Sequence, residues 1–173
     1  MNKTLLSTAL VAVIAATAFA PSAQAAGGTI TISGKVLADT CVVAVNGGST
    51  VALPTVMTSA LNTAGAVAGA TNFDVGLTGC DSNTSSATMA FSGGNINSST
   101  GNLNNTAVGG SNVQVQLLNG VSPINTSDNT NAPVISVSSG VGTTTMTAQY
   151  VAATAAATPG LVSSSVNFTL TYL

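Results

Sequence analysis

Apolar and polar residues alternate along the last eight residues of the chain, VNFTLTYL, at positions 166–173. Asparagine and threonine separate the apolar side chains, and this period of two is typical of a strand that buries one face. The apolar members are Val166, Phe168, Leu170 and Tyr172. Chain ends usually fray, so a strand built for a core at the very end of the chain needs something to cover it.

A second alternating segment lies near the other end of the chain, at residues 29–38. Threonine, serine and Lys35 form its polar face. Its apolar face consists of Ile30, Ile32, Gly34, Val36 and Ala38. The pattern predicts another strand, and only Asp39 and Thr40 separate it from the next one.

Shorter strands are predicted through the rest of the chain, with turn-rich clusters of Gly, Asn, Ser and Pro between them. They lie at residues 41–45, 49–53, 72–80, 87–91, 112–118, 132–137 and 143–152. The alanine-rich stretch 59–70 predicts at most a helical turn, because its glycines oppose a long helix. Many short strands without a helical period indicate an antiparallel β-sandwich.

The first 25 residues have the features of a secretory signal peptide. Lys3 gives a positive start, the apolar run 5–20 follows, and a small-residue cleavage site ends at Ala25. The apolar run is shorter than the roughly 20 residues that span a bilayer. We therefore expect export and cleavage, with residues 26–173 forming a single domain that has no transmembrane segment.

The two cysteines are Cys41 and Cys80. An even pair of cysteines in an exported protein implies one disulfide.

Charge is nearly absent, with two basic residues, four acidic residues and no histidine in the whole chain. Once the leader is removed, Lys35 is the only basic side chain. Nucleic-acid binding needs clustered cations, so that class is excluded. Acid–base catalysis usually needs His, Glu or a tuned Lys, and a Ser–Lys dyad through Lys35 has no nucleophile motif beside it. We expect no enzymatic activity and no cofactor.

Two turns, at residues 81–85 and 127–131, are rich in oxygen ligands that calcium could use. Neither has the acidic spacing of a calcium-binding loop. We expect solvated turns and no metal site.

The two alternating termini pose a physical problem with one natural solution. An uncovered edge strand leaves N–H and C=O groups that pair with another chain. The leading segment has the right pattern to cover such an edge, but a linker of two or three residues reaches about 10 Å at most, which is scarcely enough to cross its own sandwich. The expected partner is therefore another copy, and a head-to-tail contact of this kind generates a filament.

These residues resemble the chaperone–usher pilins, in particular the major subunits of type 1 fimbriae. GGTITISGKV at 27–36 looks like the family's N-terminal extension, although only Ala26 precedes it. Cys41 and Cys80 look like the family's half-cystines, and residues 148–160 resemble the stretch before its last strand. Gly160 falls where the family places a glycine. The ending FTLTYL matches its C-terminal motif with a penultimate aromatic residue.

The resemblance implies an all-β fold, an incomplete immunoglobulin-like β-sandwich that lacks one strand and is completed by donor-strand exchange. Residues 27–38 would be the donor strand, and its groove-filling residues would be Ile30, Ile32, Gly34 and Val36. The acceptor groove and chaperone-binding strand would include Gly160, Val166, Phe168, Leu170 and Tyr172.

The implied function is a structural subunit of an adhesive fimbria that supports cell adhesion. The implied partners are other copies and related pilins, a periplasmic chaperone and an outer-membrane usher. The implied route leads through the periplasm to the cell surface.

Two alternatives stay open at this point. The chain could be a minor adaptor or terminator pilin, or a monomeric secreted β-sandwich whose leading strand pairs within its own chain. A tip adhesin is disfavoured, because family adhesins carry an extra receptor-binding domain and residues 26–173 leave no room for one.

Overall fold

The computed structural model of the protein describes residues 31–34, 41–45 and 49–173. The predicted leader 1–25 and most of the predicted donor segment 27–38 lie outside the described residues. The chain divides into two units, residues 1–35 and 36–173. In the first unit, residues 31–34 form no helix or strand and are exposed.

The described residues of the second unit are all-β apart from one short 3-10 turn, as the sequence predicts. Its elements are β1 (Val42–Val45), η1 (Thr58–Leu61), β2 (Val67–Thr78), β3 (Ser86–Ser92), β4 (Leu103–Asn104), β5 (Gln114–Asn119), β6 (Ser122–Pro123), β7 (Val134–Ser138), β8 (Val141–Val151) and β9 (Asn167–Tyr172). Among the described residues, no helix is long and apolar enough to cross a membrane.

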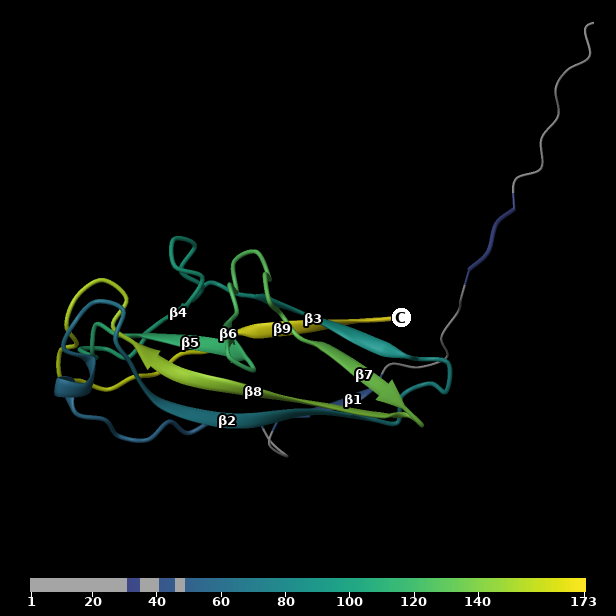
Figure 1. Ribbon diagram of the computed structural model, residues 1–173, viewed down its shortest axis with the longest axis horizontal. Helices are drawn as coiled ribbons and strands as arrows, with labels where there is room; N and C mark the ends of the chain where they lie inside the picture. Colours follow the sequence, from purple (N-terminus) through teal and green to yellow (C-terminus); the bar gives the residue numbers. More distant parts are fainter. Residues whose placement is uncertain (1–30, 35–40, 46–48) are drawn as a thin grey trace, which may run out of the picture. The chain divides into compact units, whose positions relative to one another are not determined.

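The strands form two layers that β7 joins. The order along the main path is β1-β2-β8-β7-β3-β9, and β5 pairs with β8 and carries β4 and β6. Every pairing is antiparallel. In Figure 1, β2 and β8 lie along one side of this unit, and β3 and β9 lie together along the other.

The core lies between the layers because buried and exposed side chains alternate along the strands. β3 buries Ala87, Met89 and Phe91. Met146 and Ala148 of β8 are buried in the same cluster. The alternating apolar residues seen in the sequence therefore form the two inner faces of a sandwich.

Within the second unit, two expectations about elements differ from the structure. Residues 49–53, predicted as a strand, belong to none. In the alanine-rich stretch 59–70, the helical turn is confined to η1, and β2 begins at Val67. Gly69, with a positive φ of 69°, lies within the register shift between Ala68 and Thr71, so a bulge lets the strand extend into this stretch.

Candidate functional site

The C-terminal strand lies at the end of the sheet. β9 pairs with β3, so that Phe168 lies opposite Phe91 and Tyr172 opposite Ala87. In the described part of the chain, no strand pairs with the other side of β9. The structure thus has an open edge where the sequence predicts a strand that needs cover.

The hydrogen bonds of β9 show which of its backbone groups are unpaired. Leu173 and Ser86 exchange both backbone hydrogen bonds, with N···O distances of 2.9 and 3.4 Å. In an antiparallel pair such residues alternate with residues whose N–H and C=O groups point away. The backbone groups of Phe168, Leu170 and Tyr172 therefore face the open edge.

The same edge continues upstream of β9. The carbonyl of Leu161 accepts a hydrogen bond from the amide of Ser111 (3.1 Å), and that of Ser163 from the amide of Thr106 (2.8 Å). The intervening residue, Val162, presents its backbone groups to the other side. One continuous unpaired edge therefore extends from position 162 to position 172.

Side chains along this edge alternate in the same way as the backbone groups. The even-numbered residues are half-buried and the odd-numbered ones are exposed. The half-buried set is Val162, Ser164, Val166, Phe168, Leu170 and Tyr172. The half-buried side chains and the unpaired backbone groups therefore belong to the same residues, and all of these side chains except that of Ser164 are apolar.

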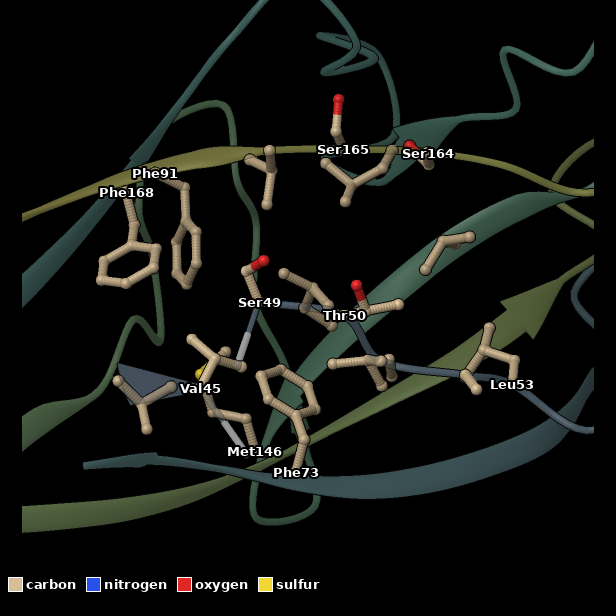
Figure 2. A pocket seen from close by; sticks show the side chains of 18 of the residues that line it. Val45, Ser49, Thr50, Leu53, Phe73, Phe91, Met146, Ser164, Ser165 and Phe168 are labelled. Carbon is tan, nitrogen blue, oxygen red and sulfur yellow. The ribbon is translucent and has the colours of Figure 1, made fainter. Parts of the chain in front are cut away.

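A cavity of about 560 Å³ lies beside this edge. Its floor comes from both layers of the sandwich and includes Phe73, Phe91, Leu117 and Met146. Residues 162–166 and Phe168 form one wall. Figure 2 shows Phe91 and Phe168 side by side, with Phe73 and Met146 across the cavity from them.

The second wall is Val45 with residues 49–53. Val45, the last residue of β1, pairs with Val75 in β2. In Figure 2, Val45 lies toward the Phe168 end of the cavity and Leu53 toward the Ser164 end. The two walls therefore run in opposite directions, and a strand placed between them would be antiparallel to one and parallel to the other.

The cavity also explains why residues 49–53 form no strand. A strand needs a neighbour that pairs with its N–H and C=O groups. Here the position beside the wall is the cavity itself, so an extended, partly apolar segment lies there without a ladder. We call the cavity and its two walls the groove.

The disulfide joins the second wall to the sheet. Cys41, directly before β1, is bonded to Cys80, directly after β2, and both are buried. The pair predicted from the sequence is therefore formed. It fixes the start of the wall, since β1 has only four residues and pairs with β2 alone among the described strands.

Tyr150 of β8 lies at the end of the groove. Its side chain lines the cavity beside Val162. Burial raises the pKa of Tyr150 above its ordinary value, so the phenol is neutral at physiological pH. The groove floor therefore carries no charge from this residue.

In each of the two turns considered for calcium binding, the aspartate accepts a hydrogen bond from a backbone amide of the same turn. The amide of Asn83 donates to Asp81 Oδ1 (2.7 Å), and the amide of Thr130 donates to Asp128 Oδ1 (2.8 Å). Hydrogen bonds from Thr130, its backbone amide first and then its side chain, hold the pKa of Asp128 below its ordinary value. Among the described residues, no three His, Cys, Asp or Glu side chains gather as a metal site.

The structure places the predicted site residues as follows. Val166 and Phe168 line the cavity, whereas Leu170 and Tyr172 pack against the core beyond it. Gly160 lies at the start of the first wall, against the backbone of Gly110. The predicted donors Ile30 and Val36 lie outside the described residues. The side chain of Ile32 is 89% exposed, and no atom lies within 4 Å of a Cβ placed on Gly34.

Sequence reasoning missed part of both walls. Val162 and Ser164 continue the alternation of β9, but the SSS run at 163–165 hides it in the sequence. Ser49 and Thr50 are polar residues of the second wall that periodicity could not single out. The signal that could have found Val162 is its spacing of four from Val166.

Comparison with protein-family models gives a match over most of the chain. Residues 30–173 match the family described as fimbrial protein.

Curated proteins with similar sequences include two fimbrial subunits. The major fimbrial subunit SMF-1 of Stenotrophomonas maltophilia is 44% identical over 163 residues, covering 87% of this chain and 95% of that protein. The type-1 fimbrial protein A chain of Escherichia coli is 35% identical over 164 residues, covering 90% of this chain and 88% of that protein.

Among solved structures, a chaperone–usher pilus has a similar fold. The TM-score is 0.61 at 22% identity, and the match covers 89% of this chain and 100% of that one. At this identity the likeness concerns the fold alone.

Proposed function

Because this chain belongs to the family of fimbrial proteins, we propose that its open groove receives residues 27–38 of a neighbouring copy as the missing strand. The chain is a structural subunit of a fimbrium at the cell surface, and its fold is an incomplete immunoglobulin-like sandwich. It associates with other subunits in the pilus and thereby supports adhesion. The role is structural and non-catalytic.

One observation carries the donor-strand proposal. The unpaired edge from 162 to 172 lies beside an apolar cavity, and its free backbone groups and inward side chains belong to the same residues. An inserted strand satisfies those backbone groups and fills the cavity with every second side chain. The leading segment offers that alternation, with Ile30, Ile32 and Val36 as apolar donors and Gly34 among them.

The energy of such a joint is sufficient to hold a fibre. Burial of each large apolar donor contributes about 1.5–3 kcal/mol, so three donors contribute roughly 5–9 kcal/mol before backbone pairing. Removal of the strand would expose the core of the acceptor. Dissociation would therefore begin with local unfolding, and the joint would be long-lived.

The open groove also calls for protection before assembly. A subunit that crosses the periplasm alone would expose an unpaired edge and an apolar cavity, which promote aggregation. A periplasmic chaperone that lends a strand would cover both, and an outer-membrane usher would exchange that strand for the next subunit's extension. The leader at 1–25 supports this route.

Deletion of residues 26–38 tests the proposal. The shortened chain is expected to remain soluble with the chaperone but to form no polymer ladder on a denaturing gel without boiling. A synthetic peptide of residues 26–38 added in trans should bind the shortened chain and raise its unfolding temperature. A peptide with Ile30 and Ile32 changed to Ser is the matched control. Polymerisation of the deleted chain, or equal stabilisation by both peptides, would contradict the proposal.

A further inference from the structure

A second cavity, of about 280 Å³, continues the groove beyond its Val162 end. The two cavities share Tyr150 and Val162. The continuations of the two groove walls, residues 55–58 and 157–162, line the second cavity. A strand that leaves the groove at this end therefore passes directly over it.

The lining of the second cavity is more apolar than polar, although Thr55, Thr58, Ser111 and Thr158 contribute to it, and apolar residues lie at its rim. Leu61 and Val113, which line it, belong to a buried cluster separate from the main core. Met57 and Leu161 also line it, yet their side chains are 75% and 78% exposed. Exposed apolar side chains gathered at the rim of such a hollow indicate a surface that is covered in an assembly.

The leading segment contains one large apolar residue that the groove does not use. Ile30, Ile32 and Val36 share one face, and the opposite face is polar up to Lys35. Leu37 lies on that opposite face, at the C-terminal end of the segment. It follows Val36 directly, at the point where a donor strand would leave the groove.

The distribution of cavity along β9 determines the direction in which the donor enters. The main cavity reaches from Val162 to Phe168, and neither Leu170 nor Tyr172 lines it. The donor segment begins with Gly27 and Gly28, which have no side chains to bury. The large side chains of the donor segment lie beside the cavities only if Gly27 and Gly28 lie beside Tyr172. The end of the segment at Val36 and Leu37 then lies beside Val162.

We propose that the second cavity is the binding site for Leu37 of the incoming subunit. This inference rests on the proposed donor-strand function, and it adds a contact outside the groove. Leu37 covers the rim formed by Met57 and Leu161 and anchors the point at which one subunit passes into the next. No charged residue lines the cavity and Leu37 carries no charge, so the contact is insensitive to salt.

Photo-cross-linking tests the location of Leu37. The full mature chain carrying p-benzoyl-phenylalanine at position 37 is assembled with isotope-labelled wild-type chain and irradiated. We expect cross-links between differently labelled chains that map to residues 55–61 or 157–162. The same label at position 35 is the control and should not reach these segments. Cross-links from position 37 that map elsewhere would overturn the inference.

Substitutions test the contribution of the contact. Leu37→Ser fibres should form but dissociate in denaturant at least about tenfold faster than wild type. Leu161→Ser should have a similar effect, and the double variant should be little worse than either single one, because the two changes remove the same contact. Lys35→Ser and Val108→Ser are the controls, since Val108 is fully exposed and does not line the cavity. Dissociation of Leu37→Ser within twofold of wild type would overturn the inference.

The two proposals fail in different ways. If fibres form without residues 26–38, the donor-strand function itself is wrong. If fibres need that segment, lose assembly with Ile32→Ser, and are indifferent to Leu37→Ser, only the second-cavity site is wrong.

Discussion

Gly160 lies directly against the backbone of Gly110: a Cβ atom on Gly160 would lie 2.6 Å from the carbonyl carbon of Gly110. Gly160 also has a positive φ of 157°, which few other residues adopt. The contact holds the start of the first wall beside the loop whose Ser111 and Thr106 amides donate hydrogen bonds to the carbonyls of Leu161 and Ser163. The open edge depends on this contact for its position.

Gly160→Ala is therefore expected to lower the free energy of unfolding of the subunit by about 1–3 kcal/mol, because the added methyl group has no space. Urea denaturation of the disulfide-bonded mature chain measures the change. Gly94→Ala is the control, because nothing lies within 4 Å of a Cβ at that position, and it should change stability by less than about 0.5 kcal/mol. Equal effects of the two variants would contradict the account of the first wall.

Phe168→Ala is expected to weaken the fibre joint by about 2 kcal/mol, because it removes a half-buried ring opposite Phe91 in the groove. The denaturant midpoint for fibre dissociation measures this loss. Thr169→Ala changes an exposed side chain on the other face of β9 and should leave the midpoint unchanged. A similar shift for both variants would show that the inner face of β9 has no special role.

Loss of the disulfide is expected to cost about 4 kcal/mol in the chain-entropy model for a loop of this length. The sequence separation between Cys41 and Cys80 is 39. Cys41→Ser with Cys80→Ser should also loosen the second wall, since β1 pairs with β2 alone among the described strands. Thermal unfolding, with peptide 26–38 binding as a second readout, checks both effects. If the variant bound the peptide as well as the wild type does, the disulfide would not be needed to hold the second wall of the groove.

Stability should vary little between about pH 5 and 9, because the chain has no histidine. The lowered pKa of Asp128 means that its stabilisation is present above the ordinary value and is lost as the pH falls through the lowered one. The raised pKa of Tyr150 means that its contribution is complete below the ordinary value and is lost as the pH rises through the raised one.

Unfolding midpoints measured from acid to alkaline pH test this profile. Asp128→Asn should flatten part of the acid limb, and Tyr150→Phe part of the alkaline limb. A transition near neutral pH would contradict the expectation.

Much of the fold could be predicted because alternation reports burial. The segments 87–91, 132–137 and 166–173 lie in or overlap strands whose inward residues are apolar. The prediction failed at 49–53, where the pattern is that of a strand but the pairing neighbour is missing from the chain's own described sheet. The periodicity of apolar residues indicates which face of a segment is buried. It does not indicate whether another strand lies beside that segment to pair with its backbone.

The site was only partly predictable for a similar reason. Phe168 and Val166 stand out in an alternating strand, whereas Val162 and Ser164 are separated from that pattern by serines. The floor of the groove combines residues from β2, β3, β5 and β8, which only the fold brings together. The second cavity likewise depends on two segments nearly 100 residues apart, 55–58 and 157–162.

Residue-resolved hydrogen exchange along β9 tests the donor-strand account most directly. In the subunit lacking residues 26–38, the amides of Thr169 and Thr171 should be protected by β3, whereas those of Phe168, Leu170 and Tyr172 should exchange rapidly. In the assembled fibre all five should be protected, because the inserted strand now accepts the hydrogen bonds of the even-numbered residues. Rapid exchange at Phe168 and Leu170 in the fibre would contradict the account.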